Sequence, residues 1–433
     1  LFMGSADPGT LRIGSARTFG ESCMYKSRIY HLILFFLVSL TSLPVYALDE
    51  PVLIRAQGDH CVDDPNCFNR FHPEIPMNTR AKPGQLIVME VRNAGDLQLD
   101  STGEWKLLDP PGSTVHPITG PVYIDGAKAG DVLAVSLIEA KPSPYGYTII
   151  SQGGFLADVF PDEQRVYWEL GENYATSRDL PGLRIPNASF PGIVTTLPGP
   201  AQHAAILARE TKLAAAGGSV SPPEPANASP GNLCGPTGTE KDNCARTFPP
   251  REYGGNLDIR YLQAGVTVYL PCYVDGCGLG LGDPHYAQGD GEVSGTAIEM
   301  GGTFTLRTKV VKGLKLPRGP HYEGPASVLR IPSTRFYATT GIPLKRSGSV
   351  PADMSYLASD ERIGELENLS KDISLATRNA LLEMIDYIVA TRGLTREQAY
   401  MVASVAVDMR IGQLVDSPNV GVTAVLPLDI FVK

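Results

Sequence analysis

The chain has 433 residues, of which 45 are glycine and 36 are proline, and its formal net charge is −9 at pH 7. So much glycine and proline disfavours a helical bundle, while 43% hydrophobic and 19% charged residues exclude wholesale disorder. The acidic balance leaves no basic surface to neutralise phosphates, so we expect no nucleic-acid partner.

The N-terminal residues have the pattern of an export signal. An apolar run, Leu32–Leu40, follows two basic residues and precedes small residues that end at Ala47. The run is too short to span a bilayer as a helix, so we predict a secretory signal peptide cleaved after Ala47 and no stable membrane anchor. Residues 1–23 precede Met24 and are interpreted as upstream sequence. A buried N-terminal helix is the alternative interpretation of the apolar run.

Six of the seven cysteines follow the predicted cleavage site, in three pairs of near neighbours. The pairs are Cys61/Cys67, Cys234/Cys244 and Cys272/Cys277. This spacing predicts three local disulfides, whereas a zinc ribbon would need C-x2-C pairs that the sequence lacks. Signal and cysteines together predict a periplasmic or secreted protein without a free thiol nucleophile.

Runs of β-branched and aromatic residues between Gly and Pro predict strands along most of the chain. In chain order they are Gln85–Arg92, Asp131–Glu139, Val266–Val274, Gly302–Val311 and Ser327–Ile331. Asp275-Gly276 is typical of a β-hairpin turn. Because no helices are expected between these strands, we predict a mainly β protein with sandwich-like or barrel-like units.

Helices are predicted only near the C-terminus. Apolar residues recur at helical spacing over Leu375–Arg392, with Gly393 as the stop. Thr395 begins a T-x-x-Q capping box for a second helix through about Asp408. A last strand is predicted near Val420–Pro427.

These elements divide the chain into five predicted parts. They are 1–47, upstream residues and signal peptide; 48–213, an N-terminal β unit; 214–248, a linker or long loop; 249–350, a β unit with the candidate metal site described next; and 351–433, a smaller α+β C-terminal part with the helical hairpin.

Residues 254–299 combine many glycines with acidic residues and a histidine. If the chain is extended there, alternate side chains share a face. The pairs so aligned are Asn256/Asp258, Asp283/His285 and Asp290/Glu292. A carboxylate beside an imidazole suits a divalent metal such as zinc, and calcium, which prefers oxygen ligands, is the alternative. For any single aspartate here, a turn at a hairpin tip is the competing interpretation.

Two His-Pro segments, around His72 and His116, are further candidates, although a lone histidine beside proline is more often structural. The sequence has no G-x-S-x-G elbow and no H-E-x-x-H pair, so activated water is a simpler hypothesis for hydrolysis than a covalent intermediate. From the residues alone two functions stay open. One is a hydrolase with a metal site, and the other is a non-catalytic secreted β-sandwich binding protein with a structural calcium site.

Six segments stand out in order along the chain. They are NRFHPEIP (Asn69–Pro76), VHPITGPVYIDGAKAGDVLAV (Val115–Val135), GYTIISQGGFL (Gly146–Leu156), PPREYGGNLDIRYL (Pro249–Leu262), GDPHYAQGDGEVSGTAIEM (Gly282–Met300) and GLTREQAYMVASVAVDMRIGQLVDSPN (Gly393–Asn419). Together they resemble the acetamidase/formamidase family over nearly the whole chain after the predicted signal. The resemblance implies hydrolysis of short aliphatic amides to a carboxylate and ammonia, a mainly β fold, a bound metal that is usually zinc, and a homodimer.

Matched residue by residue, the resemblance also implies a metal site and a base. Asp258 and His285 are the implied metal ligands, with Asp283 as a third. Glu292 is the implied base, which takes a proton from water and returns it to the leaving amine. The remaining candidates are assigned to substrate binding: Asn256, Gln288, His72 and His116.

Some positions depart from the family pattern. Phe190 stands where the family often has His before Pro-Gly, and Phe71 where Trp is usual. Cys272 and Cys277 replace small apolar residues. These changes bear on the preferred amide more than on the reaction. We therefore expect an exported amidase that uses metal-activated water.

Overall fold

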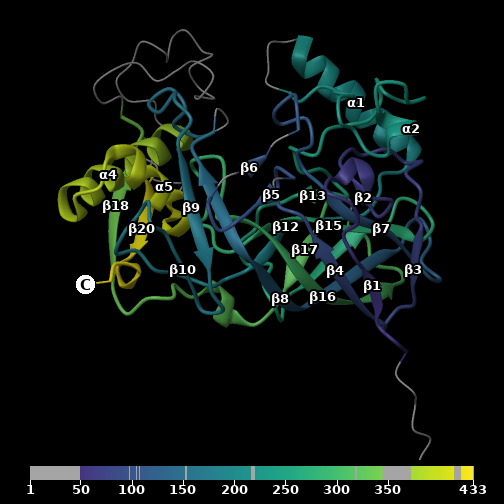
Figure 1. Ribbon diagram of the computed structural model, residues 1–433, viewed down its shortest axis with the longest axis horizontal. Coiled ribbons are helices and arrows are strands. Elements are labelled where there is room, and N and C mark those ends of the chain that lie inside the picture. Colours follow the sequence, from purple (N-terminus) through teal and green to yellow (C-terminus); the bar gives the residue numbers. More distant parts are fainter. Residues whose placement is uncertain are drawn as a thin grey trace, which may run out of the picture. The chain divides into compact units, whose positions relative to one another are not determined.

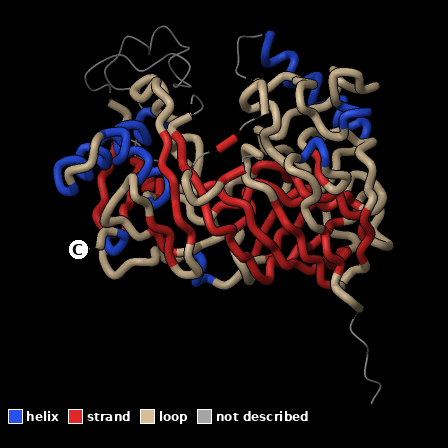
Figure 2. Tube along the Cα trace, in the orientation of Figure 1, coloured by secondary structure: helices blue, strands red, loops and turns tan. Residues whose placement is uncertain are grey.

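The structure is a computed structural model that describes residues 49–344 and 372–432, apart from 97, 104, 107, 152–153, 216–219, 317–318 and 414–420. The predicted signal peptide, residues 1–47, lies outside the described residues, as does the first part of the predicted C-terminal part. Strands dominate, so the prediction of a mainly β protein with a smaller α+β C-terminal part is confirmed (Figures 1 and 2).

One 15-stranded sheet contains most of the described strands. Its main path is β11 (Ile185–Pro186), β10 (Tyr174–Thr176), β9 (Arg165–Leu170), β8 (Val132–Ile149), β16 (Glu299–Val311), β15 (Cys277–His285), β12 (Phe190–Thr195) and β13 (Gly254–Asn256). The strands that branch from this path are β1 (Val52–Ile54), β2 (Cys67–Phe68), β3 (Thr79–Ala81), β4 (Leu86–Val91), β7 (Ile118–Ile124), β14 (Thr267–Pro271) and β17 (His321–Glu323). Pairing is antiparallel except for β1 with β4 and β3 with β7.

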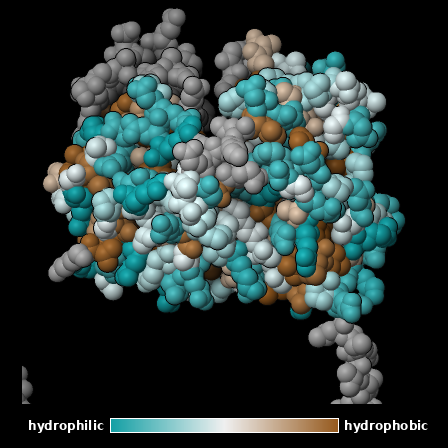
Figure 3. Space-filling model, in the orientation of Figure 1, coloured by the Kyte–Doolittle hydropathy of each residue, from teal (hydrophilic) through white to brown (hydrophobic). Residues whose placement is uncertain are grey.

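The central strands β12 and β15 are buried at every position, whereas β4 alternates between buried and half-buried residues. Glycines allow this close packing of β15 against its neighbours. A Cβ on Gly280 would lie 2.8 Å from Cγ2 of Ile118 and 2.9 Å from Cζ of Phe68. The viewed face of the molecule is largely hydrophilic, with smaller apolar areas (Figure 3). The middle of the sheet is therefore tightly packed and buried, and the residues of the candidate site lie on or next to its strands.

Five of the six predicted strands are present, as β4, β8, β14, β16 and, at the C-terminus, β20 (Gly421–Pro427). The remaining one, Ser327–Ile331, is wrong: this segment contains a 3-10 turn, Ala326–Leu329, after Pro325. Leu329 is 54% exposed, so the apolar residues that predicted a strand are not buried against a neighbour. The predicted hairpin at Asp275-Gly276 is also wrong, because β14 pairs with β8 and β17 while β15 pairs with β7, β12 and β16.

The predicted linker at 214–248 does not separate two sheets. Strand β12 precedes it and pairs with β13 and β15, which follow it, so both predicted β units contribute to one sheet. The linker contains the short helix α2 (Gly231–Cys234) and follows the helix α1 (Pro200–Ala215). Helix α1 contradicts the prediction that helices occur only near the C-terminus. Its buried face is narrow, with His203 and Ile206, so no helical apolar stripe marks it in the sequence.

The C-terminal part combines a helical hairpin with a small sheet. The helices are α4 (Ile373–Arg392) and α5 (Arg396–Ala406), and the sheet order is β18 (Phe336–Gly341), β20 (Gly421–Pro427), β19 (Asp408–Gln413). Gly393 ends α4 with a left-handed φ of 68°, and Thr395 and Gln398 form the predicted capping box of α5. Helix α5 ends at Ala406, two residues before the predicted end, because Asp408 begins β19.

Two features complete the described fold. A two-stranded sheet joins β5 (Gln98–Leu99) to β6 (Trp105–Lys106). The three predicted cysteine pairs are joined as disulfides, Cys61–Cys67, Cys234–Cys244 and Cys272–Cys277. Within the part of the chain that the structure describes, no helix has the length and apolar character needed to cross a membrane.

Candidate active site

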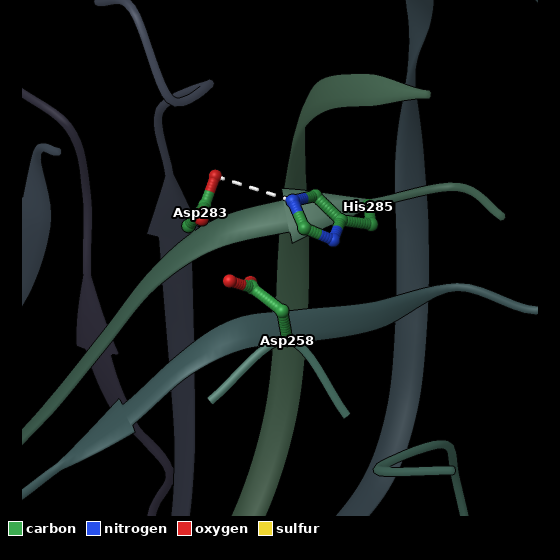
Figure 4. Close-up of side chains that lie close together, drawn as sticks. All are labelled: Asp258, Asp283 and His285. Atoms are coloured by element: carbon green, nitrogen blue, oxygen red, sulfur yellow. Dashed lines mark ion pairs between the residues drawn. The ribbon is translucent and has the colours of Figure 1, made fainter. Parts of the chain in front are cut away.

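Acidic side chains and one histidine converge near the ends of β13, β15 and β16. Asp283 and His285 lie at the end of β15, and Asp258 follows β13 by two residues. Glu299 begins β16 directly opposite His285 in the strand register. Figure 4 shows that the side chains of Asp258, Asp283 and His285 point toward one another.

The imidazole of His285 is at the centre of this cluster. Its Nε2 atom lies 3.3 Å from Asp283 Oδ1, 3.2 Å from Glu299 Oε2 and 3.8 Å from Glu292 Oε1. Ligand atoms of Asp258, Asp283 and His285 all lie within 4.8 Å of one another, and those of His285, Glu292 and Glu299 do the same. Both sets have the spacing of a metal-binding group, and they share the histidine.

At three residues of the site the backbone is not extended, contrary to the assumption behind the predicted pairs. Asp258, Asp283 and Glu292 have φ values of 47°, 53° and 44°, in the left-handed region. Such a conformation costs of the order of 1–3 kcal/mol for a non-glycine residue, so it persists only where the surrounding structure enforces it. Asp290 consequently does not share a face with Glu292; its carboxylate accepts a hydrogen bond from the hydroxyl of Tyr261.

Gly192 in β12 makes room for the cluster. A Cβ at this position would lie 2.6 Å from Asp258 Oδ1, 2.8 Å from the backbone oxygen of Asp283 and 3.0 Å from Cε1 of His285. Any other residue would therefore push the acidic and imidazole groups apart. The neighbouring Phe190 packs its ring edge-on against His285, with 5.1 Å between ring centroids. The family position that often holds histidine is thus next to the site, and here it supplies an apolar contact.

Several donor atoms of the cluster are buried without a hydrogen-bond partner among the described residues. They are Asp258 Oδ1, Asp283 Oδ1, His285 Nε2 and Glu299 Oε2. A buried polar atom left unpaired is costly, and more so when it is charged. Oxygen and nitrogen atoms that face one another in this way suit a divalent cation, and the atoms of Asp258, Asp283 and His285 lie close enough together to bind one.

Three carboxyl groups of the cluster have raised pKa values. Burial and the nearby Asp258 raise the pKa of Glu292 well above its ordinary value, and burial and Asp283 do the same to the pKa of Asp258. Burial raises the pKa of Glu299 to about 7, against the opposing effect of His285, and Asp283 adds to the rise. The site therefore concentrates negative charge that a bound cation would stabilise.

Asp283 and His285 shift each other's pKa values in opposite directions. Burial by itself would raise the pKa of Asp283, but His116 and His285 together hold it below its ordinary value. Burial would lower the pKa of His285, but Glu299 and Asp283 raise it well above its ordinary value. Burial lowers the pKa of His116, whose Nε2 lies 3.7 Å from Asp283 Oδ2.

Gln288 lies behind the cluster. Its Oε1 accepts a hydrogen bond of 2.9 Å from Nδ1 of His285, and its Nε2 donates one of 2.8 Å to the backbone oxygen of Asp258. With Nδ1 bonded in this way, Nε2 of His285 faces the carboxylates. Gln288 was assigned to substrate binding from the sequence; in the structure it ties two cluster segments together and does not line the cavity.

A cavity of about 400 Å³ opens onto the cluster. Of the residues assigned to catalysis, metal binding or substrate binding, its lining includes Asn256, Asp283, Glu292 and His116. His72, which the sequence assigned to substrate binding, does not line this cavity. Its Nε2 lies 3.8 Å from Glu240 Oε2, and its ring packs against His203, because its His-Pro segment belongs to a separate packed region.

Glu299 has no role in the sequence-based assignment. Its acidic residue type is visible in the sequence, but its position opposite His285 depends on the pairing of β15 with β16. One of its carboxylate oxygens accepts a hydrogen bond from the backbone of Ala297, and the other faces His285. The strand register that creates this contact has no local signal in the sequence.

A buried cluster of carboxylates and an imidazole with shifted pKa values, beside a cavity, is typical of an enzyme active site. Residues 56–433 match the Acetamidase/Formamidase family. The chain belongs to this family, as its motifs predicted, and it is an amidase, a hydrolase of non-peptide C–N bonds.

Individual relatives agree with this placement. The chain is 31% identical to an acetamidase of Mycolicibacterium smegmatis, over 77% of this chain and 84% of that protein. It is also 31% identical to a formamidase of Methylophilus methylotrophus, over 85% of this chain and 90% of that protein. Among solved structures, the γ-lactamase from Delftia acidovorans superimposes with a TM-score of 0.75 at 30% identity, over 88% of this chain and 93% of the other.

Proposed function

We propose that the protein is an exported amidase that hydrolyses short aliphatic amides, of the formamide and acetamide type, with the help of a divalent metal. The observation that carries the metal proposal is the convergence of buried, unpaired donor atoms from Asp258, Asp283 and His285. The names of the curated relatives support linear amides, and that of the solved relative supports a lactam as a further substrate.

Asp258, Asp283 and His285 would hold the cation. When bound, a divalent metal lowers the pKa of a water ligand to about 7 and polarises an amide carbonyl. An amide carbonyl is a poor electrophile, so both effects are useful here. Two carboxylates and an imidazole suit zinc better than calcium, because calcium takes six to eight oxygen ligands and has no need of His285.

Glu292 is the proposed base. Its carboxylate lines the cavity, and its raised pKa suits a group that must both take and release a proton near neutral pH. It takes a proton from the attacking water and returns it to the amide nitrogen as the C–N bond breaks, which leaves a carboxylate and ammonia. Asn256 and His116, which also line the cavity, would donate hydrogen bonds to the amide.

The competing function is a secreted binding protein with a structural calcium ion. Membership of an amidase family argues against it, and so does the buried imidazole at the centre of the cluster. A single assay distinguishes the amidase from the calcium-binding protein. We expect the purified protein to release ammonia from acetamide, to lose that activity after chelation and to regain it with zinc but not with calcium. If zinc-loaded protein neither releases ammonia from formamide or acetamide nor opens the ring of a γ-lactam to the amino acid, the proposal is contradicted.

Export is proposed from the signal-like N-terminal pattern and the three disulfides. Disulfides persist in oxidising compartments such as the periplasm, so the cysteine pairs and the leader are consistent with each other. N-terminal sequencing of the natural protein should begin at Leu48. An intact leader on protein from the cytoplasmic fraction would contradict export.

A homodimer is proposed from the family resemblance alone. Light scattering on the purified protein should give a mass of twice the chain. A monomer that retains full amidase activity would contradict it.

A further inference from the structure

The cavity is much larger than the amides that the relatives' names suggest. Counting about 30 Å³ for each non-hydrogen atom, which is the volume of a water molecule in the liquid, formamide and acetamide need about 90–120 Å³. The cavity measures about 400 Å³. A small amide bound at the acidic cluster would therefore leave most of this space to water.

Part of the cavity lining is apolar. Val115, Tyr147, Ile149 and Phe248 line it together with the acidic residues of the cluster. Specific ligand sites commonly combine apolar walls with a few polar groups that fix the reacting part of the ligand. The cavity can therefore take the amide group at the acidic residues and an apolar substituent against the apolar lining.

Phe248 is the clearest element of this apolar part. Its side chain is 41% exposed, although it is a large hydrophobic residue. Its ring packs edge-on against His116 at 5.3 Å between centroids, and the guanidinium of Arg246 lies 4.8 Å from its centroid. Two contacts thus hold an exposed aromatic ring beside a residue of the site, where it is available to an apolar ligand.

The charges in the lining disfavour an anionic substituent. Asp283, Glu292 and Glu299 repel an anion. The lining also includes Glu163 and Arg165, which form an ion pair with 2.6 Å between Oε1 and Nε, and so neutralise each other. A neutral apolar substituent meets no such repulsion.

We infer that the preferred substrates are neutral primary amides whose acyl part carries an apolar group of about propyl to benzyl size. This inference rests on the proposed amidase function and names the substrate class of that same site. The reaction is unchanged: water attacks the carbonyl carbon, a C–O bond forms, the C–N bond breaks and ammonia leaves with the proton that Glu292 returns.

The test is the specificity constant kcat/KM of the zinc-loaded mature protein for formamide, acetamide, butyramide and phenylacetamide. Burying a methylene group should raise kcat/KM about fourfold, so butyramide should exceed acetamide by at least about tenfold. In the variant Phe248→Ala, the ratio of kcat/KM for phenylacetamide to that for acetamide should fall about tenfold. Tyr322→Ala is the matched control, because Tyr322 is an equally exposed aromatic residue (44%) outside the cavity lining, and it should leave the ratio unchanged.

The possible results separate the inference from the function on which it rests. A series in which formamide or acetamide is the best substrate overturns the inference and leaves the amidase function intact. An unchanged ratio in Phe248→Ala also overturns it. Failure to hydrolyse any of the four amides overturns the proposed function on these substrates, and the inference with it.

Discussion

The helical hairpin and the candidate site are built by different kinds of interaction. In the hairpin, contacts between near neighbours fix the helix ends: Asp372 accepts a hydrogen bond from Leu375 N, and Thr395 caps α5. In the site, Asp258 and Asp283 have left-handed backbones that their own sequence does not favour. Groups distant in sequence hold them there, including Gly192 and Gln288.

This difference has consequences for mutation. A change at a helix cap removes one local hydrogen bond and should alter stability without touching chemistry. A change in the site disturbs groups that come from several strands, so it should alter metal binding or turnover more than stability. The predictions below test this separation, beginning with the largest expected effect.

Glu292→Gln should abolish most of the turnover. The side-chain amide of the introduced glutamine cannot take a proton from water. General base catalysis contributes about 10²–10⁴-fold, so the rate of ammonia release from acetamide should fall by that factor. Thermal unfolding followed by circular dichroism should show a folded protein. Glu323→Gln, an exposed acid in β17, is the control. Normal turnover in Glu292→Gln would remove Glu292 from the mechanism.

Gly192→Ala should damage the site sterically. Its Cβ would lie 2.6 Å from Asp258 Oδ1, so the carboxylate must move, and a misplacement of about 1 Å can cost about 10²-fold in rate. We expect zinc affinity and turnover to fall together. Gly231→Ala is the matched control, because a Cβ there meets no atom within 4 Å. If the two variants behave alike, close packing at Gly192 does not organise the site.

Gln288→Leu should weaken metal binding without removing a ligand. Residues that orient a metal-binding histidine typically contribute 10–100-fold to metal affinity, so zinc competition titrations should show a loss of about that size. Gln263→Leu is the control, because Gln263 also donates to a backbone oxygen, that of Arg260, outside the cluster. Unchanged zinc affinity would show that His285 is oriented without Gln288.

Thr395→Ala should have the smallest effect and should spare the chemistry. It removes the side-chain half of the capping box of α5, which typically costs about 1 kcal/mol of stability. Urea unfolding should reveal this loss while kcat/KM for acetamide stays unchanged. A large fall in kcat/KM would mean that the hairpin and the site are coupled, against the separation described above.

The same contrast explains what the sequence could predict. The strands β4, β8, β14 and β16 and both C-terminal helices follow from periodicity and caps. The helix α1 has too narrow a buried face to be recognised, and Ser327–Ile331 has strand-like residues without a strand partner.

In the site, the residue types and motifs singled out Asp258, Asp283, His285 and Glu292, and the structure brings these residues together. They could not show the left-handed backbones, or the contact of Glu299 with His285, because these depend on strand register and tertiary packing.

The central claim is that Asp258, Asp283 and His285 hold a divalent cation. Elemental analysis of the purified protein tests it most directly, with Asp258→Asn combined with His285→Ala as the site variant and Asp275→Asn combined with His321→Ala as a control that changes the same residue types elsewhere. We predict about one zinc-type cation per chain in the natural protein and the control, and almost none in the site variant. The same metal content in a folded site variant would contradict the claim.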